Sequence, residues 1–280
     1  MITDLTGKAA DALKNKKLWL LDMDGTIYNE NQIFEGTLDF LNQIRQNGGR
    51  YIFITNNSSK SVADYVKKVN DMNIPAGYED FYTSSQATAM YIKEHYPGQT
   101  VYCMGTRSLI QELRESGLRV VTVPDDTATV VLIGFDTENT SEKIRNTCIM
   151  LGKDVAYLAT NPDLVCPVSF GFIPDCGSMS IMLKNATGKE PFFIGKPQPI
   201  MVDCVLKMLK NTGISREDAV IVGDRLYTDI ATGANAGVDT ICVLSGEASM
   251  KDIQEWDGEP PWIFQDVKEI FQKLQTEPSA

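Results

Sequence analysis

The stretch Leu18–Thr26 reads LWLLDMDGT, and it decides which fold the rest of the chain is expected to adopt. Its apolar residues lack the alternation of a half-buried strand, which indicates a parallel strand covered on both faces. Open α/β sheets bind ligands at the carboxyl ends of such strands, and this strand ends at Asp22. Side chains two residues apart in an extended chain point the same way, so Asp22 and Asp24 are predicted to converge. Gly25 then allows a sharp turn.

Three later segments also place polar residues directly beside apolar runs or glycine. They are Tyr51–Ser58 (YIFITNNS), Gly195–Pro197 (GKP) and Val220–Asp224 (VIVGD), the last followed by Asp229. Together with LWLLDMDGT they resemble, in the same order, the four motifs of the haloacid dehalogenase (HAD) superfamily of phosphohydrolases. An Asp-Gly pair alone is typical of a hairpin turn, but four ordered matches argue against that interpretation.

The length and charge of the chain restrict the classes of protein to which it can belong. Its 280 residues are enough for two domains, at roughly 100–200 residues each. Its formal charge of -11 disfavours nucleic acid and anionic membranes as partners, because both would repel it. The motif carboxylates would also repel a phosphate ester, so a bound cation and a placed lysine are expected beside them.

The sequence carries no sign of a membrane or secretory segment. No apolar run approaches the roughly 18 residues of a membrane span, and the first residues are polar and lysine-rich. Six cysteines occur without a Cys-x-x-Cys pair, and we interpret them as reduced thiols. These features predict a soluble protein of the cytoplasm.

The spacing of the motifs predicts a core domain that is interrupted by an insertion. The interval from Asp22 to Thr55 fits one strand–helix–strand unit, whereas the interval from Thr55 to Lys196 holds a second α/β pattern. We expect an α/β fold, with a Rossmann-like doubly wound parallel sheet in residues 1–85 and 190–280 and an insertion at 86–189. The predicted strands are 101–103, 120–123, 130–133, 155–158, 219–222 and 240–244, and the predicted helices are 108–115, 141–151 and 229–236.

An insertion at this place resembles the type IIA branch of the superfamily, in which it forms a cap domain over the active site. Ala159–Asp163 (ATNPD) and Gly195–Pro199 (GKPQP) are similar to the NagD-like group of nucleotide and p-nitrophenyl phosphatases. That group usually has Pro-Gly-x-Gly where this chain has Pro174–Gly177 (PDCG). Asp tolerates left-handed backbone better than most residues, so the loop is expected to form. The substrate preference of the group does not transfer across this difference.

The resemblance implies a role for each acidic motif residue. Asp22 is expected to attack phosphorus and form an aspartyl phosphate, and Asp24 to act first as general acid and then as general base. Mg²⁺ is expected as cofactor, held by Asp22, by the backbone carbonyl of Asp24 and by Asp224. Asp229 is expected to support this metal site.

Other residues are expected to bind the substrate. Thr55, the backbone N–H of Asn56 and Lys196 are predicted to hold the phosphoryl group. In the insertion, Asn161 and Asp175 are candidates for contact with the leaving group, although both residue types are also typical of turns. The expected partner is a small-molecule phosphate ester. A homodimer formed through the cap is a further expectation from the resemblance.

Three other functions use similar residues and stay open at this point. A phosphomutase retains the phosphoryl group for transfer between hydroxyls, and a phospho-acceptor switch needs the strand-end Asp, the Lys and Mg²⁺ but neither Asp24 nor a cap. A scaffold would keep the site without activity. Asp24 and the insertion favour a Mg²⁺-dependent phosphatase. Its ester is left open among nucleotides, sugar phosphates, phosphoglycolate and pyridoxal phosphate.

Overall fold

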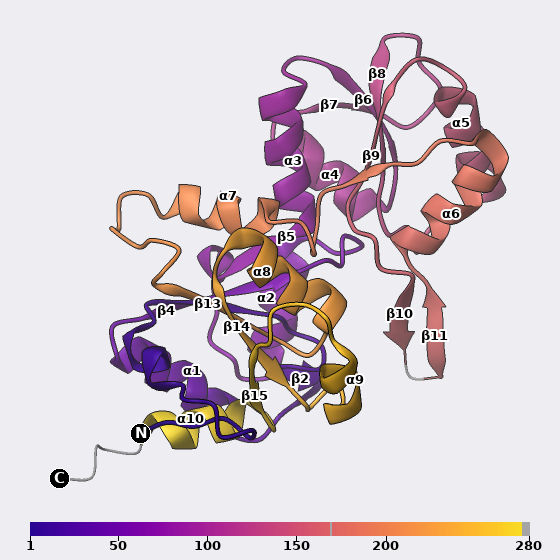
Figure 1. Ribbon diagram of the computed structural model, residues 1–280. Helices are drawn as coiled ribbons and strands as arrows, with labels where there is room; N and C mark the ends of the chain where they lie inside the picture. The colour runs from indigo at the N-terminus through magenta and orange to yellow at the C-terminus, as the bar shows by residue number, and fades with distance from the viewer. Residues whose placement is uncertain (169, 276–280) are drawn as a thin grey trace. The chain divides into compact units, whose positions relative to one another are not determined.

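The computed structural model describes residues 1–168 and 170–275, which form two compact units (Figure 1). The first unit contains Met1–Ile54, Val66–Tyr82 and the described part of Pro197–Ala280, and the second contains Thr55–Tyr65 and Thr83–Lys196. The predicted α/β class with parallel sheets is confirmed. The second unit extends beyond the predicted insertion at both ends, and it also includes Thr55–Tyr65, which is the end of the second motif and the residues that follow it. That 86–189 acts as a cap stays a prediction.

The first unit is built on a parallel sheet in which β1 (Leu18–Leu21) lies between β13 (Ala219–Gly223) and β4 (Arg50–Thr55). Because these strands run in the same direction, their carboxyl ends meet at one edge of the sheet. The order of the sheet is β15-β14-β13-β1-β4-β5, and its outer strands are β5 (Phe81–Thr83), β14 (Asp239–Val243) and β15 (Trp262–Phe264).

The continuous apolar sequences of β1 and β13 explain their central place in this sheet. Every residue of both strands is buried, as expected of strands that are covered on both faces. Leu21 pairs with Val222, and the N–H of Asp22 donates to the Val222 carbonyl at 2.9 Å. The hydrogen-bonded ladder therefore continues up to Asp22 and fixes the point at which the chain leaves the sheet.

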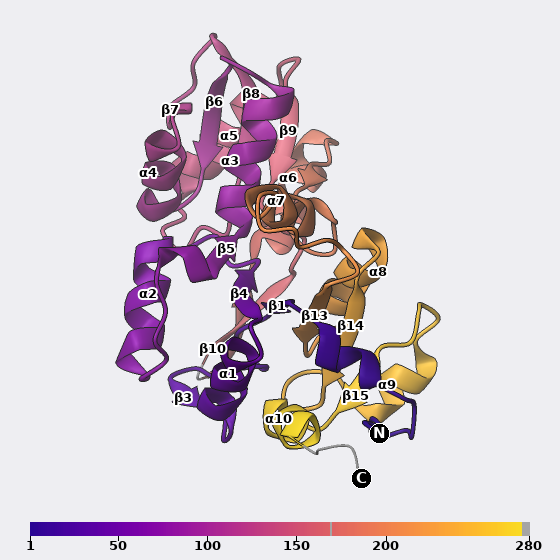
Figure 2. The same ribbon diagram turned by 90° about the vertical axis from the view of Figure 1, so that its left-hand side faces the viewer.

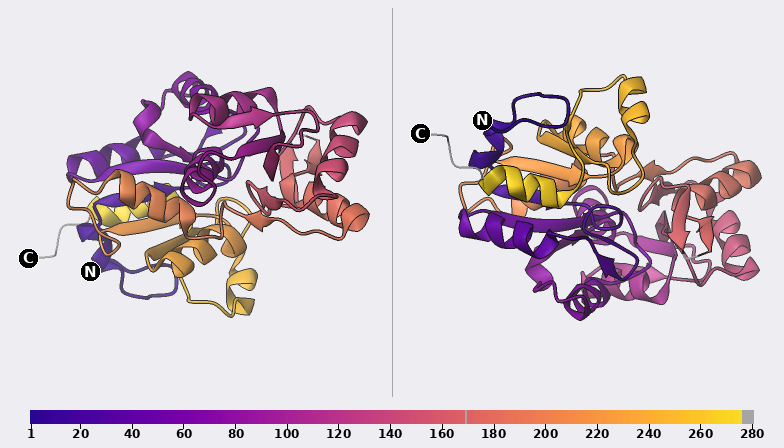
Figure 3. Two further views of the ribbon diagram at one scale, coloured as in Figure 1. Left: turned by 90° about the horizontal axis from the view of Figure 1, so that it is seen from above. Right: turned by 90° about the horizontal axis from the view of Figure 1, so that it is seen from below.

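Amphipathic helices complete the first unit. The helices α1 (Thr37–Gln46) and α10 (Val267–Gln275) lie side by side, as Figure 2 and the right-hand view of Figure 3 show. Phe40 and Ile270 are among the residues that they bury. The other segments are 3₁₀ helices at Asp11–Asn15 and Tyr78–Asp80, the hairpin of β2 (Tyr28–Asn29) and β3 (Gln32–Ile33), the part of α2 (Val62–Asp71) from Val66 onward, α7 (Ile200–Met208), a π-helix at Leu226–Ile230, α8 (Ala231–Ala236) and α9 (Met250–Glu255).

The second unit has its own parallel sheet, with helices on both faces (Figure 1). Neighbouring residues of one strand alternate between two apolar clusters: Val101 packs with helices on one face of the sheet, whereas Tyr102 packs with helices on the other face. The sheet has the order β12-β9-β8-β6-β7, with β6 (Thr100–Met104), β7 (Arg119–Val121), β8 (Ala128–Ile133), β9 (Ala156–Ala159) and β12 (Phe192–Phe193), and the helices are α3 (Ser84–His95), α4 (Arg107–Glu115), α5 (Ser141–Leu151) and α6 (Cys176–Thr187).

Two local features differ from the sequence-based expectation. The helix predicted at 229–236 begins earlier, as a π-helical turn over Leu226–Ile230 that continues into α8. In the second unit, β10 (Val165–Val168) and β11 (Gly171–Pro174) pair as an antiparallel hairpin, in a stretch for which the sequence predicted no strand. Proline and glycine weaken the strand signal there.

Within the described ranges, no helix is long and apolar enough to span a bilayer.

Candidate active site

Three aspartates from the first unit form one cluster at the end of its sheet. Asp22 follows β1, Asp224 follows β13, and Asp229 lies in the π-helical turn. One carboxylate oxygen of each lies within 4.8 Å of those of the other two, and Asp224 and Asp229 are buried. Like charges this close repel one another in a partly buried place, so a cation would stabilise the cluster. An all-oxygen donor set is the kind that Mg²⁺ prefers, and the residues therefore fit the expected metal.

The carboxylate of Asp224 is held by one backbone N–H, and two glycines leave the space that it occupies. Its Oδ2 accepts the N–H of Glu247 at 2.8 Å, which fixes the orientation of the side chain. A Cβ added to Gly25 would lie 2.4 Å from Asp224 Oδ2, and one added to Gly246 would lie 2.0 Å from the same atom. Gly25 also has φ +87°, a left-handed conformation that glycine adopts readily. Both positions therefore need glycine for Asp224 to occupy its place.

Asp229 is the third member of the cluster. Its Oδ2 accepts the N–H of Arg225 at 3.2 Å, and its own N–H donates to the Arg225 carbonyl at 3.0 Å. A Cβ on Gly223 would lie 2.3 Å from the Asp229 Cβ, so the close approach depends on glycine there as well. The sequence predicted a supporting role for Asp229. The structure places its carboxylate among the candidate ligands themselves.

Asp24 lies outside this cluster, on the tight loop that follows β1. Its backbone forms an isolated bridge with Tyr28, and the N–H of Gly25 donates to the Tyr28 carbonyl at 2.9 Å. The Asp24 side chain is 45% exposed, and its Oδ1 lies 3.7 Å from the ammonium nitrogen of Lys68. The two acids of the first motif thus stand in different surroundings, which allows them different chemical roles.

In the second unit, the structure brings together Asn56 and Lys196, which are far apart in the sequence. The Asn56 amide nitrogen donates to the Lys196 carbonyl at 3.0 Å, and its Oδ1 accepts the Lys196 N–H at 2.8 Å. The same amide nitrogen donates to Asp163 Oδ2 at 2.9 Å. A Cβ on Gly195 would lie 2.5 Å from Asn56 Oδ1. The Asn56 side chain therefore fixes the backbone that carries Lys196, a function that the sequence did not predict.

Thr55 is the last residue of β4 and is buried. Its Oγ1 accepts the N–H of Asn57 at 3.2 Å, so the hydroxyl proton is left to donate to another group. Lys196 is buried as well, which is unusual for a lysine. These placements are consistent with the predicted binding of an anion, while the binding itself stays a prediction.

Comparison with known proteins identifies the family. Residues 19–119 match the family of haloacid dehalogenase-like hydrolases, and residues 193–270 match a second, HAD-hydrolase-like family. An acid sugar phosphatase from Staphylococcus haemolyticus is 35% identical over 263 residues, which cover 94% of this chain and 98% of that protein. The chain belongs to the HAD-like hydrolases.

Solved structures place this HAD-like hydrolase among phosphatases. A 4-nitrophenylphosphatase from Thermotoga maritima has a TM-score of 0.88 and 33% identity, over 95% of this chain and 100% of that chain. NagD from E. coli K-12 has a TM-score of 0.82 and 30% identity, over 91% and 98%. A glycerol phosphate phosphatase from Mycobacterium tuberculosis, solved in complex with magnesium, has a TM-score of 0.86 and 29% identity, over 93% and 78%. The protein is a type IIA, NagD-like HAD phosphatase, and thus a phosphoric monoester hydrolase.

Arg225 is a charged residue of this HAD phosphatase that sequence reasoning missed. Burial lowers the pKa of Arg225, but the negative charge of Asp22, with further contributions from Tyr227 and Asp224, raises it above its ordinary value. Its Nε lies 2.9 Å from Glu247 Oε2. Arg225 therefore stays charged and offsets part of the negative charge of the aspartate cluster. The sequence feature that could have identified Arg225 is its position directly after Asp224.

The two candidate substrate residues of the inserted region lie in a buried network. The Asn161 amide nitrogen donates to Asp163 Oδ2 and to Asp175 Oδ1, each at 3.0 Å. Asp175 caps α6 by accepting the N–H of Cys176 at 2.5 Å. Its φ is -99°, so the loop does not need the left-handed backbone that had been considered for it. The structure gives both residues a structural role, and substrate contact by either stays a prediction.

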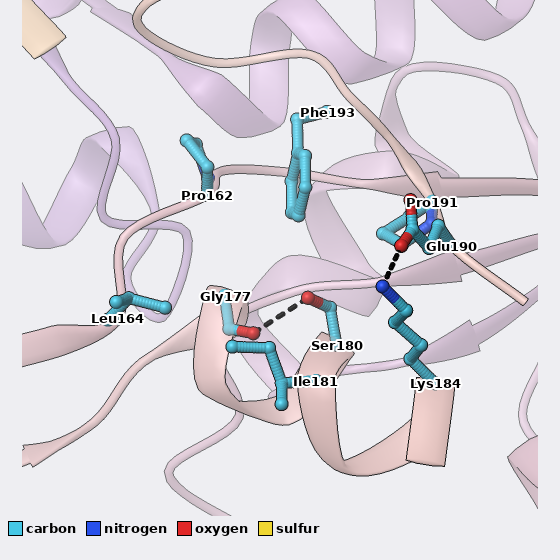
Figure 4. Close-up of a pocket in the computed structure, with 9 residues that line it drawn as sticks. All are labelled: Pro162, Leu164, Gly177, Ser180, Ile181, Lys184, Glu190, Pro191 and Phe193. Carbon is cyan, nitrogen blue, oxygen red and sulfur yellow. Dashed lines mark hydrogen bonds and ion pairs between the residues drawn. The ribbon is translucent and has the colours of Figure 1, made fainter. Parts of the chain in front are cut away.

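A separate pocket in the second unit, of about 250 Å³, contains none of the predicted site residues (Figure 4). An ion pair between Lys184 and Glu190 stands on one side of it, and the Ser180 hydroxyl donates to the Gly177 carbonyl at 2.7 Å. Most of the other side chains are apolar, so the pocket lacks the convergent acids of a phosphoryl-transfer site. The lining residues are Pro162, Leu164, Gly177, Ser180, Ile181, Lys184, Glu190, Pro191 and Phe193.

Proposed function

We propose that this HAD phosphatase hydrolyses small-molecule phosphate monoesters in two steps, through an aspartyl phosphate on Asp22 and with Mg²⁺ as cofactor. The observation that supports this proposal is that the two aspartates of the first motif lie in different surroundings. Asp22 shares a cluster with Asp224 and Asp229, whereas Asp24 stands apart from them beside a lysine. One acid is thus suited to nucleophilic attack at a metal site and the other to proton transfer.

In the first step, a carboxylate oxygen of Asp22 attacks phosphorus and the bond from phosphorus to the ester oxygen breaks. The Asp24 carboxyl group gives its proton to the departing alkoxide, which leaves as the alcohol. In the second step, water attacks the phosphorus of the aspartyl phosphate while the Asp24 carboxylate takes a proton from it. The bond from phosphorus to Asp22 then breaks and releases inorganic phosphate, which restores both side chains.

The carboxylates of Asp22, Asp224 and Asp229 and the backbone carbonyl of Asp24 would hold the metal. When bound, Mg²⁺ would orient the phosphoryl group and offset its negative charge. The carboxylate cluster supports this assignment, as does the magnesium complex of the mycobacterial glycerol phosphate phosphatase. Asp229 joins the proposed ligand set because its carboxylate oxygen belongs to the cluster.

Thr55, the backbone N–H of Asn56 and the Lys196 ammonium group are proposed to bind the phosphoryl oxygens. An ammonium group that stays in place while charge moves onto Asp22 and the leaving group stabilises the transition state without reorganisation. The double hydrogen bond between Asn56 and the Lys196 backbone supports this role, because it fixes the point from which the lysine side chain extends.

The named relatives suggest the class of ester. They are an acid sugar phosphatase, a 4-nitrophenylphosphatase and a glycerol phosphate phosphatase, all of which point to small monoesters. The charge of -11 argues against nucleic acid and anionic membranes as partners. A cytoplasmic location and a homodimer formed through residues 86–189 stay predictions.

The test is a screen of the purified chain with Mg²⁺ against p-nitrophenyl phosphate, sugar phosphates and glycerol phosphate, with free phosphate as the readout. Many turnovers without a bisphosphate activator are expected, together with reversible loss of activity in EDTA. Asp22→Asn serves as the inactive control. One turnover only would support a phospho-acceptor switch, and a need for a bisphosphate would support a phosphomutase. No release of phosphate from any ester would contradict the proposal.

A further inference from the structure

Lys68 on α2 reaches toward the candidate acid–base residue. Its Nζ lies 3.7 Å from Asp24 Oδ1 and 3.9 Å from the centre of the Tyr28 ring. The Lys68 side chain is only 19% exposed, whereas lysines usually extend into solvent. Such a placement costs side-chain entropy and part of the hydration of the ammonium group. Contacts with a carboxylate and with an aromatic face offset this loss.

The two groups that Lys68 meets belong to one tight loop. Asp24 and Tyr28 are bridged through their backbones, and Met23 O accepts the N–H of Ile27 at 2.8 Å. Tyr28 is fully buried, so its ring gives the ammonium group a fixed support. Asp24 is the more exposed partner, so fewer neighbouring atoms restrict the rotamer of its side chain. Lys68 supplies a restraint from a different element of the fold.

We propose that Lys68 is a positioning residue, which holds the Asp24 carboxyl group in the orientation that proton transfer to the oxygen of the leaving group requires. The proposal rests on the acid–base role of Asp24 in the proposed function. Lys68 Nζ and Asp24 Oδ1 form an ion pair at 3.7 Å, a separation that is longer than a hydrogen bond. The pair thus orients the carboxyl group by attraction while that oxygen keeps its capacity for proton transfer. Misplacement by about 1 Å is enough to lower a rate by a large factor.

The adjacent residue provides a matched control. Lys67 has the same side chain on the same helix, but its Nζ lies 2.5 Å from Asp71, one turn further along. The Lys67 side chain is 78% exposed, so its pair with Asp71 is an ordinary surface ion pair that contributes little. Lys67→Met therefore removes the same charge and the same number of atoms as Lys68→Met without touching Asp24.

The test compares p-nitrophenyl phosphate with phenyl phosphate, two similar esters whose leaving groups differ in their need for a proton. The ratio kcat/KM reports the steps up to the departure of the phenol. For Lys68→Met, kcat/KM is expected to fall about 10-fold further with phenyl phosphate than with p-nitrophenyl phosphate, which is part of the roughly 100-fold or more that general acids supply. Lys68→Arg should restore most of the difference, and Lys67→Met should match wild type with both esters.

Asp24→Asn, measured beside these variants, separates the two ways in which the idea can fail. If Asp24→Asn discriminates strongly between the esters but Lys68→Met lowers both equally or neither, the role of Lys68 is wrong and the proposed function stands. If Asp24→Asn shows no discrimination, the acid–base role of Asp24 is wrong. Far-UV circular dichroism checks folding, and Lys68→Gln replaces Lys68→Met in the same comparison if the methionine variant does not fold.

Discussion

Asn56 and Lys196 hold each other through a reciprocal pair of hydrogen bonds, with the Lys196 N–H donating to Asn56 Oδ1 at 2.8 Å and Asn56 Nδ2 donating to the Lys196 carbonyl at 3.0 Å. The two residues are separated along the chain by most of the second unit. The amide therefore anchors the end of that unit, the place where the third motif begins. Lys196, which is proposed to bind phosphate, therefore depends for its position on Asn56. The neutral side chain of Asn56 need not contact the substrate itself.

We expect Asn56→Asp to lower both the stability of the protein and its catalytic activity. The substitution removes both donors of the amide and places a carboxylate beside Asp163, whose Oδ2 lies 2.9 Å from Asn56 Nδ2. The loss of buried hydrogen bonds should lower the free energy of unfolding by about 2–4 kcal/mol, as measured in urea. kcat/KM should fall with p-nitrophenyl phosphate.

The neighbouring residue supplies the control for this change. Asn57 uses its Oδ1 to accept the N–H of Ser59 at 3.0 Å, and an aspartate can make the same bond. Asn57→Asp should therefore stay close to wild type in urea. Equal unfolding midpoints for the two variants would show that the amide of Asn56 does not anchor Lys196.

Gly246→Ala should impair binding of Mg²⁺. The new Cβ would lie 2.0 Å from Asp224 Oδ2, so the carboxylate must leave its place among the candidate ligands. Calorimetric titration with Mg²⁺ alone should show an affinity at least about 10-fold weaker, in line with the loss of a well-placed supporting contact. This measurement does not depend on turnover.

Gly48→Ala is the control for the effect of replacing a glycine. Gly48 has φ +74° and open space around its Cβ position, so alanine there strains the backbone without approaching the acids. This variant should lose some stability and keep the affinity of wild type for Mg²⁺. Unchanged affinity in Gly246→Ala would contradict the placement of Asp224 as a ligand.

The stability of the second unit should depend on pH through Glu112. Burial, together with the charges of Glu115 and Asp64, raises the pKa of Glu112 to about 7 from an ordinary 4.5. Between these values the unfolded chain releases the proton while the folded chain keeps it. Stability is therefore greatest below the unfolded pKa and is lost as pH rises toward the folded pKa.

Glu112→Gln removes this ionisation. Compared with wild type, the variant should gain more stability at about pH 8 than at about pH 5 in urea denaturation. Glu115→Gln, on the same helix, changes an exposed carboxylate and should show a smaller difference between the two pH values. An identical pH dependence for wild type and Glu112→Gln would contradict the assignment.

The parts of the fold that sequence reasoning predicted are those with a local signal. The apolar run before Asp22 predicted the central strand, because burial on both faces leaves a continuous apolar sequence. The helix predicted at 141–151 occurs with those bounds, begun by the Thr140 cap. The resemblance to the HAD motifs implied that Asp22 and Asp224 share a metal site, and the structure brings both carboxylates into one cluster.

The missed features depend on partners that are distant in the sequence. The bond from Asn56 to Lys196 joins two chain segments whose pairing no local pattern encodes. The π-helical turn that directs Asp229 into the cluster has the composition of an ordinary helix start. Lys68 carried no signal beyond its place in an amphipathic helix, since its contacts come from the loop after β1.

The stereochemical course at phosphorus tests the central claim most directly. A phosphate ester made chiral by isotopic substitution is hydrolysed in isotopically labelled water, and the configuration of the released phosphate is determined. Two successive in-line displacements, the first by Asp22 and the second by water, predict retention of configuration. Inversion would mean that water attacks the ester directly, and it would contradict the aspartyl phosphate.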